Sequence, residues 1–143
     1  MKKFSLILIL MMLLSCEDLV EQTYKFNVKN ETENELYFYI DDKYPDTTIT
    51  TVNVTNKIIP MSTFRLGLFK AQIEFFEEAT NDTLSFYFIS KETVSNFDWN
   101  EIRNEYLILK RYDVSFDDFQ TIDFEIVYPP TVEMENIRMY PTE

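Results

Sequence analysis

The chain has 143 residues and a formal net charge of −12, from 25 acidic and 13 basic side chains. Binding to nucleic acid depends on Lys and Arg side chains that neutralise phosphates, so this charge argues against a nucleic-acid partner. Histidine is absent and Cys16 is the only cysteine, which excludes disulfides within the chain, Ser-His-Asp and Cys-His catalysis, and metal sites built on histidine or on several thiolates.

Residues 1–15 have the parts of a secretory signal peptide. Lys2 and Lys3 precede a nearly unbroken apolar run over residues 4–14. This run is too short for a membrane-spanning helix, which needs about 20 apolar residues, and it matches the apolar region of a signal peptide. It ends in Leu-Leu-Ser directly before Cys16, which resembles the lipobox of bacterial lipoproteins. We expect cleavage after residue 15 and lipidation of Cys16.

Residues 16–23 are expected to form the lipidated cysteine and a short tether. Loss of the two signal-peptide lysines changes the formal charge from −12 to −14. A surface this acidic repels anionic lipid head groups, so the acyl chains on Cys16 must supply the affinity for the membrane.

The domain that follows begins with strand patterns. Alternating apolar and polar side chains over residues 24–28 predict a strand, and after a polar loop at 29–34 the apolar and aromatic residues 36–40 predict a second, paired with the first as a hairpin or as the start of a meander. Tyr-Pro-Asp-Thr at 44–47 is a turn sequence, because proline fixes its own φ and aspartate bonds to the backbone ahead of it. The Thr-, Ile- and Val-rich residues 48–54 predict an edge strand.

The middle of the chain contains two more strand patterns and one ambiguous segment. Residues 63–68 predict a strand. Residues 70–79 fit both a helical face and strand alternation, and a short helix is the prediction. After a turn at 81–82, residues 84–89 are apolar on both faces, which is typical of a strand in the middle of a sheet.

Two capping boxes predict short helices. Asp98 followed by Glu101, and Ser115 followed by Asp118, have the spacing at which each side chain bonds to a backbone N–H of the first turn. The side chains expected on one face of the first helix are Trp99, Ile102 and Tyr106.

The segment that starts at Asp113 also resembles a calcium-binding loop, because oxygen-bearing side chains alternate along it. Its sixth position is Asp118 where such loops have Gly, and its twelfth is Phe124 where they have Glu. Helix capping by Ser115 explains the same residues, so we expect no metal site here.

Residues 107–114 and 124–128 complete the strand pattern, and the second of these ends at two prolines that cannot donate to a sheet ladder. Residues 131–143 hold few apolar anchors and are expected to form a C-terminal tail. The predicted architecture is one mainly β, sandwich-like domain over residues 24–130, with two or three short helices in its connections.

Several segments resemble those of a known family. They are Tyr-Pro-Asp-Thr at 44–47, Asp-Thr-Leu-Ser at 82–85, the helix at Trp99, Leu-Lys-Arg-Tyr-Asp at 109–113, residues 115–118 and Ile-Val-Tyr-Pro-Pro at 126–130. The chain is similar over nearly its whole length to small uncharacterised lipoproteins of Bacteroidales-type bacteria. In such bacteria, acidic residues after the lipidated cysteine, here Glu17 and Asp18, resemble a surface-export signal. The resemblance implies an outer-membrane location but no functional residue.

Little in the sequence predicts catalysis. The single glycine, Gly67, excludes glycine-rich phosphate loops. Acidic pairs such as Asp41 and Asp42 are sequence neighbours whose side chains usually diverge, whereas a glycosidase needs two carboxylates at a set separation. We therefore expect no enzyme activity and no cofactor.

Three tyrosines are the candidate ligand-facing residues. Tyr37 and Tyr39 share one face of their predicted strand, and Tyr87 lies on the strand at 84–89. Together they could form an exposed aromatic platform for a sugar or a peptide. We favour the alternative that the short helices cover this face, because soluble monomers seldom expose large apolar patches.

The sequence thus predicts a lipoprotein anchored in the bacterial outer membrane through acyl chains on Cys16, on the surface or the periplasmic face. The domain is expected to act without catalysis, as an interaction or structural module with an envelope protein or a glycan as its partner. The alternative is a glycan-binding accessory module on the cell surface.

Overall fold

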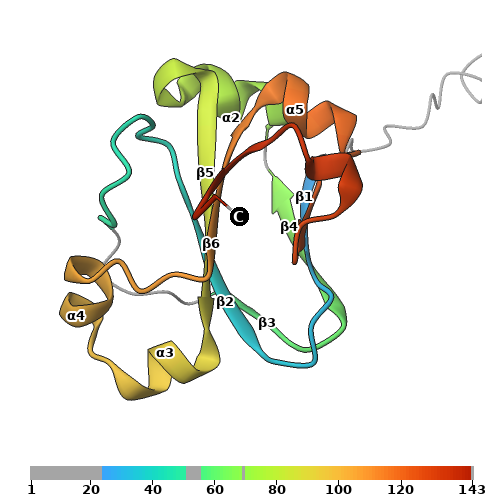
Figure 1. Cartoon of the computed structure of the whole chain (residues 1–143). Helices are drawn as coiled ribbons and strands as arrows, with labels where there is room; N and C mark the ends of the chain where they lie inside the picture. Colours follow the sequence, from blue (N-terminus) through green and yellow to red (C-terminus); the bar gives the residue numbers. More distant parts are fainter. Residues whose placement is uncertain (1–23, 51–55, 69, 143) are drawn as a thin grey trace, which may run out of the picture.

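The computed structural model describes residues 24–50, 56–68 and 70–142, so the predicted signal peptide, the tether and Cys16 lie outside the described residues (Figure 1). The strands are β1 (Tyr24–Asn30), β2 (Leu36–Asp41), β3 (Asn56–Ile58), β4 (Ser62–Leu68), β5 (Thr83–Ser90), β6 (Lys110–Ser115), β7 (Glu125–Tyr128) and β8 (Arg138–Tyr140). The helices are α2 (Gln72–Glu78), α3 (Lys91–Asn96), α4 (Trp99–Asn104) and α5 (Phe116–Thr121), with 3-10 turns η1 (Thr80–Asp82) and η2 (Val132–Met134).

Within the described residues the strands form two sheets. The smaller has the order β4-β1-β7, and the larger has the order β3-β2-β5-β6-β8. Among the strands that the structure describes, β1 and β7 are the one parallel pair. This confirms the predicted mainly β, sandwich-like domain, although four short α-helices are present where two or three were expected. The additional helix is α3, whose N-cap Ser90 accepts a hydrogen bond from the Thr93 N–H.

An aromatic core fills the space between the sheets. Its largest fully buried members are Phe26, Phe38, Phe76, Phe86, Phe88, Tyr112 and Phe119. Helices α2 and α5 lie together at one end of the sheets and close the core there (Figure 1). β5 is the central strand of the larger sheet, and residues 84–89 are all buried, as their apolar pattern predicted.

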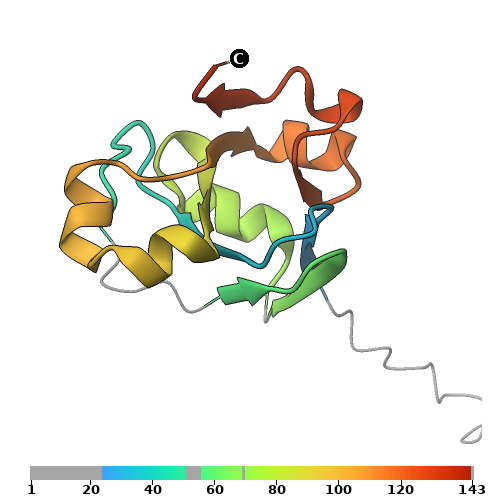
Figure 2. The ribbon, with the colours of Figure 1, turned by 60° about the horizontal axis from the view of Figure 1, so that its bottom comes forward.

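A second, smaller cluster lies on the outer face of the larger sheet. Its buried members are Tyr39, Ile49, Tyr87, Ile89 and Ile102. Helix α4 and the segment 42–50 lie side by side over this face (Figure 2). The larger sheet is therefore buried on both faces around β5.

The predicted pairing of the first two strands is wrong. β1 pairs with β4 and β7, whereas β2 pairs with β3 and β5 in the other sheet. The buried Asn30 amide holds this crossing, because it donates to the carbonyl of Asn34 at 2.7 Å and to that of Ile59 at 3.2 Å. Its oxygen accepts from the Thr32 N–H at 2.9 Å. These bonds lead the chain from one sheet to the other instead of back along β1.

Two other expectations need correction. Residues 48–50 of the predicted edge strand are not in a strand, since Ile49 is buried against the outer face, and residues 51–54 lie outside the described residues. The strand at 125–128 is not the last, because β8 pairs with the edge of β6. Met134 and Ile137 of the expected tail are buried in the main core.

The helical predictions are confirmed. Residues 72–78 form α2, and both capping boxes are present at the starts of α4 and α5. The placement of Tyr106 on a helical face with Trp99 and Ile102 is wrong, because α4 ends at Asn104 and Tyr106 has a left-handed φ of 54°. The predicted strand at 107–114 begins three residues later, at Lys110. Among the described residues, no helix combines the length and apolar character needed to cross a bilayer.

Candidate functional site

The register of the larger sheet brings polar side chains into two rows on its outer face. Directly opposed residues on neighbouring strands share a face, so the pairing gives the rows by itself. One row runs across β2, β5, β6 and β8 as Tyr39, Tyr87, Arg111 and Tyr140. The next row is Asp41, Ser85, Asp113 and Arg138.

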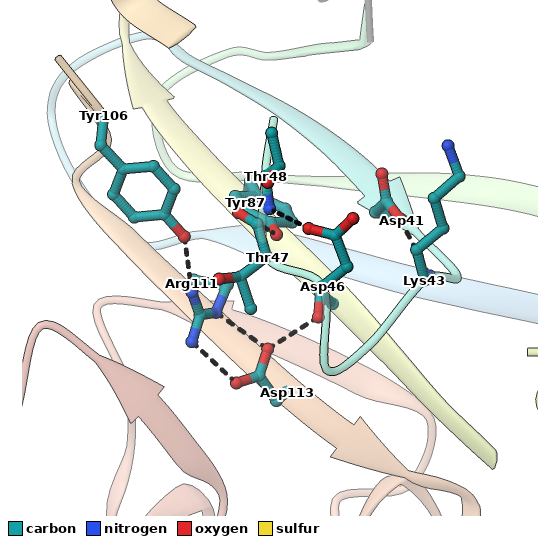
Figure 3. Close-up of polar contacts among 10 residues, drawn as sticks. Asp41, Lys43, Asp46, Thr47, Thr48, Tyr87, Tyr106, Arg111 and Asp113 are labelled. Carbon is teal, nitrogen blue, oxygen red and sulfur yellow. Dashed lines mark hydrogen bonds and ion pairs between the residues drawn. The ribbon is translucent and has the colours of Figure 1, made fainter. Parts of the chain in front are cut away.

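An ion pair lies at the centre of these rows (Figure 3). The Arg111 guanidinium donates from Nε to Oδ1 of Asp113 at 2.9 Å and from a terminal nitrogen to Oδ2 at 3.1 Å. The Ser85 hydroxyl donates to the same Oδ1 at 2.7 Å. The second terminal nitrogen of Arg111 donates to the Tyr106 hydroxyl oxygen at 2.5 Å. Both oxygens of the carboxylate are therefore bonded from within the protein.

The environment of Arg111 keeps it charged. Burial alone would lower its pKa, but the hydrogen bonds to Asp113 and Tyr106 and the attraction of the carboxylate outweigh burial, and the pKa lies above its ordinary value. The side chains are 11% and 2% exposed for Arg111 and Asp113. A buried pair of this kind fixes geometry more than it raises stability, because its desolvation offsets much of its attraction.

The three candidate tyrosines do not form an exposed platform. Tyr39 and Tyr87 are 6% and 0% exposed, and their rings stack with centroids 4.4 Å apart. Tyr37 is half-buried and donates to Glu35 at 3.4 Å. The candidate platform is thus contradicted for Tyr39 and Tyr87, and the favoured alternative of a covered face is confirmed, because the segment 42–50 and helix α4 cover them.

Side-chain bonds hold the covering segment in place. The Tyr87 hydroxyl donates to the Thr47 carbonyl at 3.3 Å, and Arg103 of α4 donates to the Ile49 carbonyl at 2.8 Å. The Thr50 hydroxyl donates to Asp41 at 2.9 Å. Burial raises the pKa of Tyr87 well above the ordinary range, so its hydroxyl stays protonated and able to donate. These bonds keep the outer face of the larger sheet covered, so Tyr39 and Tyr87 are not exposed to a ligand there.

The stacked tyrosines give a matched pair of predictions. Tyr87→Phe removes the bond to Thr47 and should lower the free energy of unfolding by about 0.5–1.5 kcal/mol. The Tyr39 hydroxyl is buried without a hydrogen-bond partner in the part of the chain that the structure describes, so Tyr39→Phe should leave stability equal or slightly higher. Urea unfolding of both variants checks this, and a larger loss for Tyr39→Phe than for Tyr87→Phe would contradict it.

A polar pocket opens beside Asp113, with a volume of about 680 Å³. We call it the polar pocket, and its lining residues are Tyr44, Asn81, Thr83, Asp113, Ser115, Asp118, Asn136 and Arg138. These residues come from the segment 42–50, η1, the ends of β5 and β6, α5 and the start of β8. The Arg138 guanidinium lies 5.4 Å from the centre of the Tyr44 ring.

The sequence did not predict the polar pocket. Arg111 and Asp113 are two residues apart on a strand, which is the spacing that places both side chains on one face. That signal was available from the sequence, but Asn136 and Arg138 lie in the expected tail, and nothing local indicates that they approach Tyr44.

A second pocket of about 540 Å³ lies between the loop after β1 and helix α3. Glu35 on its wall forms ion pairs with Lys57 at 3.4 Å and Lys91 at 3.6 Å. Desolvation alone would raise the pKa of Glu35, but the attraction of the two lysines outweighs it and holds the pKa below 4.5. Glu35 is thus the carboxylate of this pocket that is held in ion pairs.

Glu35 gives a prediction for pH. A carboxyl whose pKa is depressed by folding contributes stability above its unfolded pKa and loses that contribution as the pH falls through its folded pKa. Wild-type protein should therefore be more stable than Glu35→Gln at pH 7, and the gap should close at low pH, where the carboxyl is protonated in the folded and the unfolded state. The check is the urea midpoint at both pH values. Glu105→Gln, at an exposed position without an ion pair in the described part of the chain, is the control and should show a smaller gap.

Within residues 24–50, 56–68 and 70–142, no three acidic side chains gather as a metal site would require. The predicted helix cap at Ser115 is confirmed. The Ser115 hydroxyl accepts from the Asp118 N–H at 3.2 Å and donates to the Asp118 carboxylate at 2.7 Å. The polar side chains that line the two pockets can form hydrogen bonds with a polar molecule.

Comparison of the chain with protein-family models, curated proteins and solved structures gave no match. The resemblance to small envelope lipoproteins remains a prediction from the sequence.

Proposed function

We propose that the mature chain is an outer-membrane lipoprotein, anchored through acyl chains on Cys16, whose domain binds a partner without catalysis. The observation that carries this proposal is the N-terminal sequence, in which two lysines and an apolar run lead to Leu-Leu-Ser before the lone cysteine. One acyl chain binds a membrane only marginally, so the two or three chains of a bacterial lipoprotein are needed for a stable anchor.

The spacing between Cys16 and the domain supports an anchored role. β1 begins at Tyr24, eight residues after the cysteine. A fully extended chain covers at most about 3.3–3.6 Å per residue, so the domain would stay within roughly 30 Å of the bilayer surface. The acidic surface would keep it from lying flat on anionic head groups.

The state of the polar side chains supports a role without catalysis. A general base needs a lone pair that can reach the substrate. Asp113 is the most buried carboxylate beside the polar pocket, and Arg111 and Ser85 already occupy both of its oxygens. Asp118 is bonded to Ser115 as a helix cap. These carboxylates are therefore suited to shaping a binding surface.

Metabolic labelling tests the anchor. Cells grown with an alkyne-tagged palmitate should incorporate the tag into the wild-type chain and not into Cys16→Ser, because only the thiol accepts the lipid. Ser15→Ala keeps a small residue before the cysteine and should label normally, as the matched control. An intact chain that still carries Met1, or an unmodified Cys16 thiol in mass spectrometry, would contradict the proposal. Protease treatment of intact cells then separates the surface from the periplasmic face.

A further inference from the structure

The polar pocket has the size of a small-molecule site. Its volume of about 680 Å³ lies within the roughly 300–1,000 Å³ typical of ligand pockets. Four separate stretches of the chain contribute to its wall, and Asp113, held by Arg111, is part of that wall. Such a wall is fixed by the fold, so a ligand would meet a largely preformed surface.

The charge of the lining argues against a strongly charged ligand. Arg138 is the one cationic side chain in the lining, and it lies over the Tyr44 ring. The two carboxylates, Asp113 and Asp118, already accept hydrogen bonds from the protein. An anion would meet both carboxylates on a protein of net charge −12, and a cation would meet Arg138. A neutral polar molecule avoids both conflicts.

The groups that remain available match the hydroxyls of a sugar. Asn136 is exposed, lines the pocket and makes no side-chain hydrogen bond to the described parts of the chain, so its amide has one acceptor and two donors available for a ligand. Asn81 uses only its amide nitrogen, in a long 3.4 Å bond to the Tyr44 carbonyl, and its oxygen is left to accept. Neighbouring sugar hydroxyls both donate and accept, as these amides do. The Tyr44 ring supplies an apolar edge for the sugar carbons.

We infer that the polar pocket binds a neutral saccharide, an inference that rests on the proposed role of the domain as a binding module. The sequence suggested Tyr37, Tyr39 and Tyr87 as a candidate site for a glycan. We place the glycan instead in the pocket beside Asp113. The residues assigned to recognition are Tyr44, Asn81, Asn136 and Arg138.

Nuclear magnetic resonance of the mature lipidated chain, in a detergent without a sugar head group, tests this inference. The probes are glucose, galactose, mannose, N-acetylglucosamine and cellobiose, with glucosamine and glucuronate as charged counterparts. At least one neutral sugar should give saturable shifts of the Asn81 and Asn136 side-chain amides. Glucosamine and glucuronate should bind more weakly than that sugar. Absence of shifts with every neutral sugar, or equal binding of the charged ones, would overturn the inference.

Variants separate the polar pocket from the rest of the surface. Asn136→Ala should weaken binding about tenfold, because the lost hydrogen bonds have no replacement. Asn81 has a φ of 55°, so Asn81→Gly removes the amide and keeps the left-handed backbone, with a similar loss expected. Gln120→Ala, at an exposed position outside the pocket, should bind as wild type. Unchanged binding in both pocket variants would overturn the inference, and palmitate labelling reads the anchor separately.

Discussion

Replacing Asp113 by alanine is expected to lower the free energy of unfolding by about 3–5 kcal/mol, which is the usual cost of breaking a buried ion pair from one side. The loss leaves the Arg111 guanidinium, 11% exposed, without its carboxylate, and leaves the Ser85 hydroxyl without its acceptor. Urea unfolding followed by tryptophan fluorescence measures it. Asp42→Ala, at an exposed position one residue after β2, is the control and should change stability by less than about 0.5 kcal/mol.

A double variant separates the charge effect from lost packing. Because an isolated buried charge is the main cost, Arg111→Met combined with Asp113→Ala should be more stable than Asp113→Ala alone. Asp113→Asn should fall between wild type and Asp113→Ala, since the amide oxygen still accepts one bond. A loss under about 1 kcal/mol for Asp113→Ala would mean that solvent reaches the pair and that the pocket wall is less rigid than its contacts imply.

Local patterns predicted the elements with the strongest physical signals. The both-face apolar run at 84–89 could belong only to a strand buried on two sides, and it became the centre of the larger sheet. The two capping boxes depend on spacing within a single turn, so they are visible without tertiary information. These features depend on residues close together in the chain, so they could be predicted from the sequence alone.

Features that depend on distant segments were missed. Alternation shows which side chains share a face, but it does not show what lies over that face. Tyr39 and Tyr87 were assigned correctly to one face, whereas the cover provided by residues 42–50 depends on a hydrogen bond from Tyr87 to Thr47, forty residues earlier. The crossing at Asn30 was missed because its bonds to Ile59 join two separate loops.

The polar pocket illustrates the same limit. β8 is only three residues long, so no periodic pattern identifies it, and its pairing with β6 brings Arg138 opposite Asp113. Without that pairing, Asn136 and Arg138 belong to an apparent tail. A short edge strand is thus decisive for the candidate site and is the kind of element that sequence patterns detect least well.

Replacing Phe119 by alanine is expected to cost about 3–5 kcal/mol, because this ring is the centre of the aromatic core. It is 0% exposed and its centroid lies 4.9 Å from that of Phe26, in an edge-to-face contact. Further ring contacts join it to Phe76, Phe86 and Phe124. The substitution would leave a cavity where both sheets, α2 and α5 meet, and neighbours packed on every side can collapse into it only in part.

Phe97 offers a control of identical chemistry. Its side chain is 45% exposed between α3 and α4, so Phe97→Ala removes far less buried area and should cost under about 1 kcal/mol. Urea unfolding of the two variants compares one residue type in two environments. Equal losses would contradict the aromatic core, since stability would then depend on ring content and not on where the rings pack. A large loss for Phe119→Ala alone would show that the packing of this ring stabilises the fold. It would also show that α5, which lies beside the polar pocket, is held by that packing.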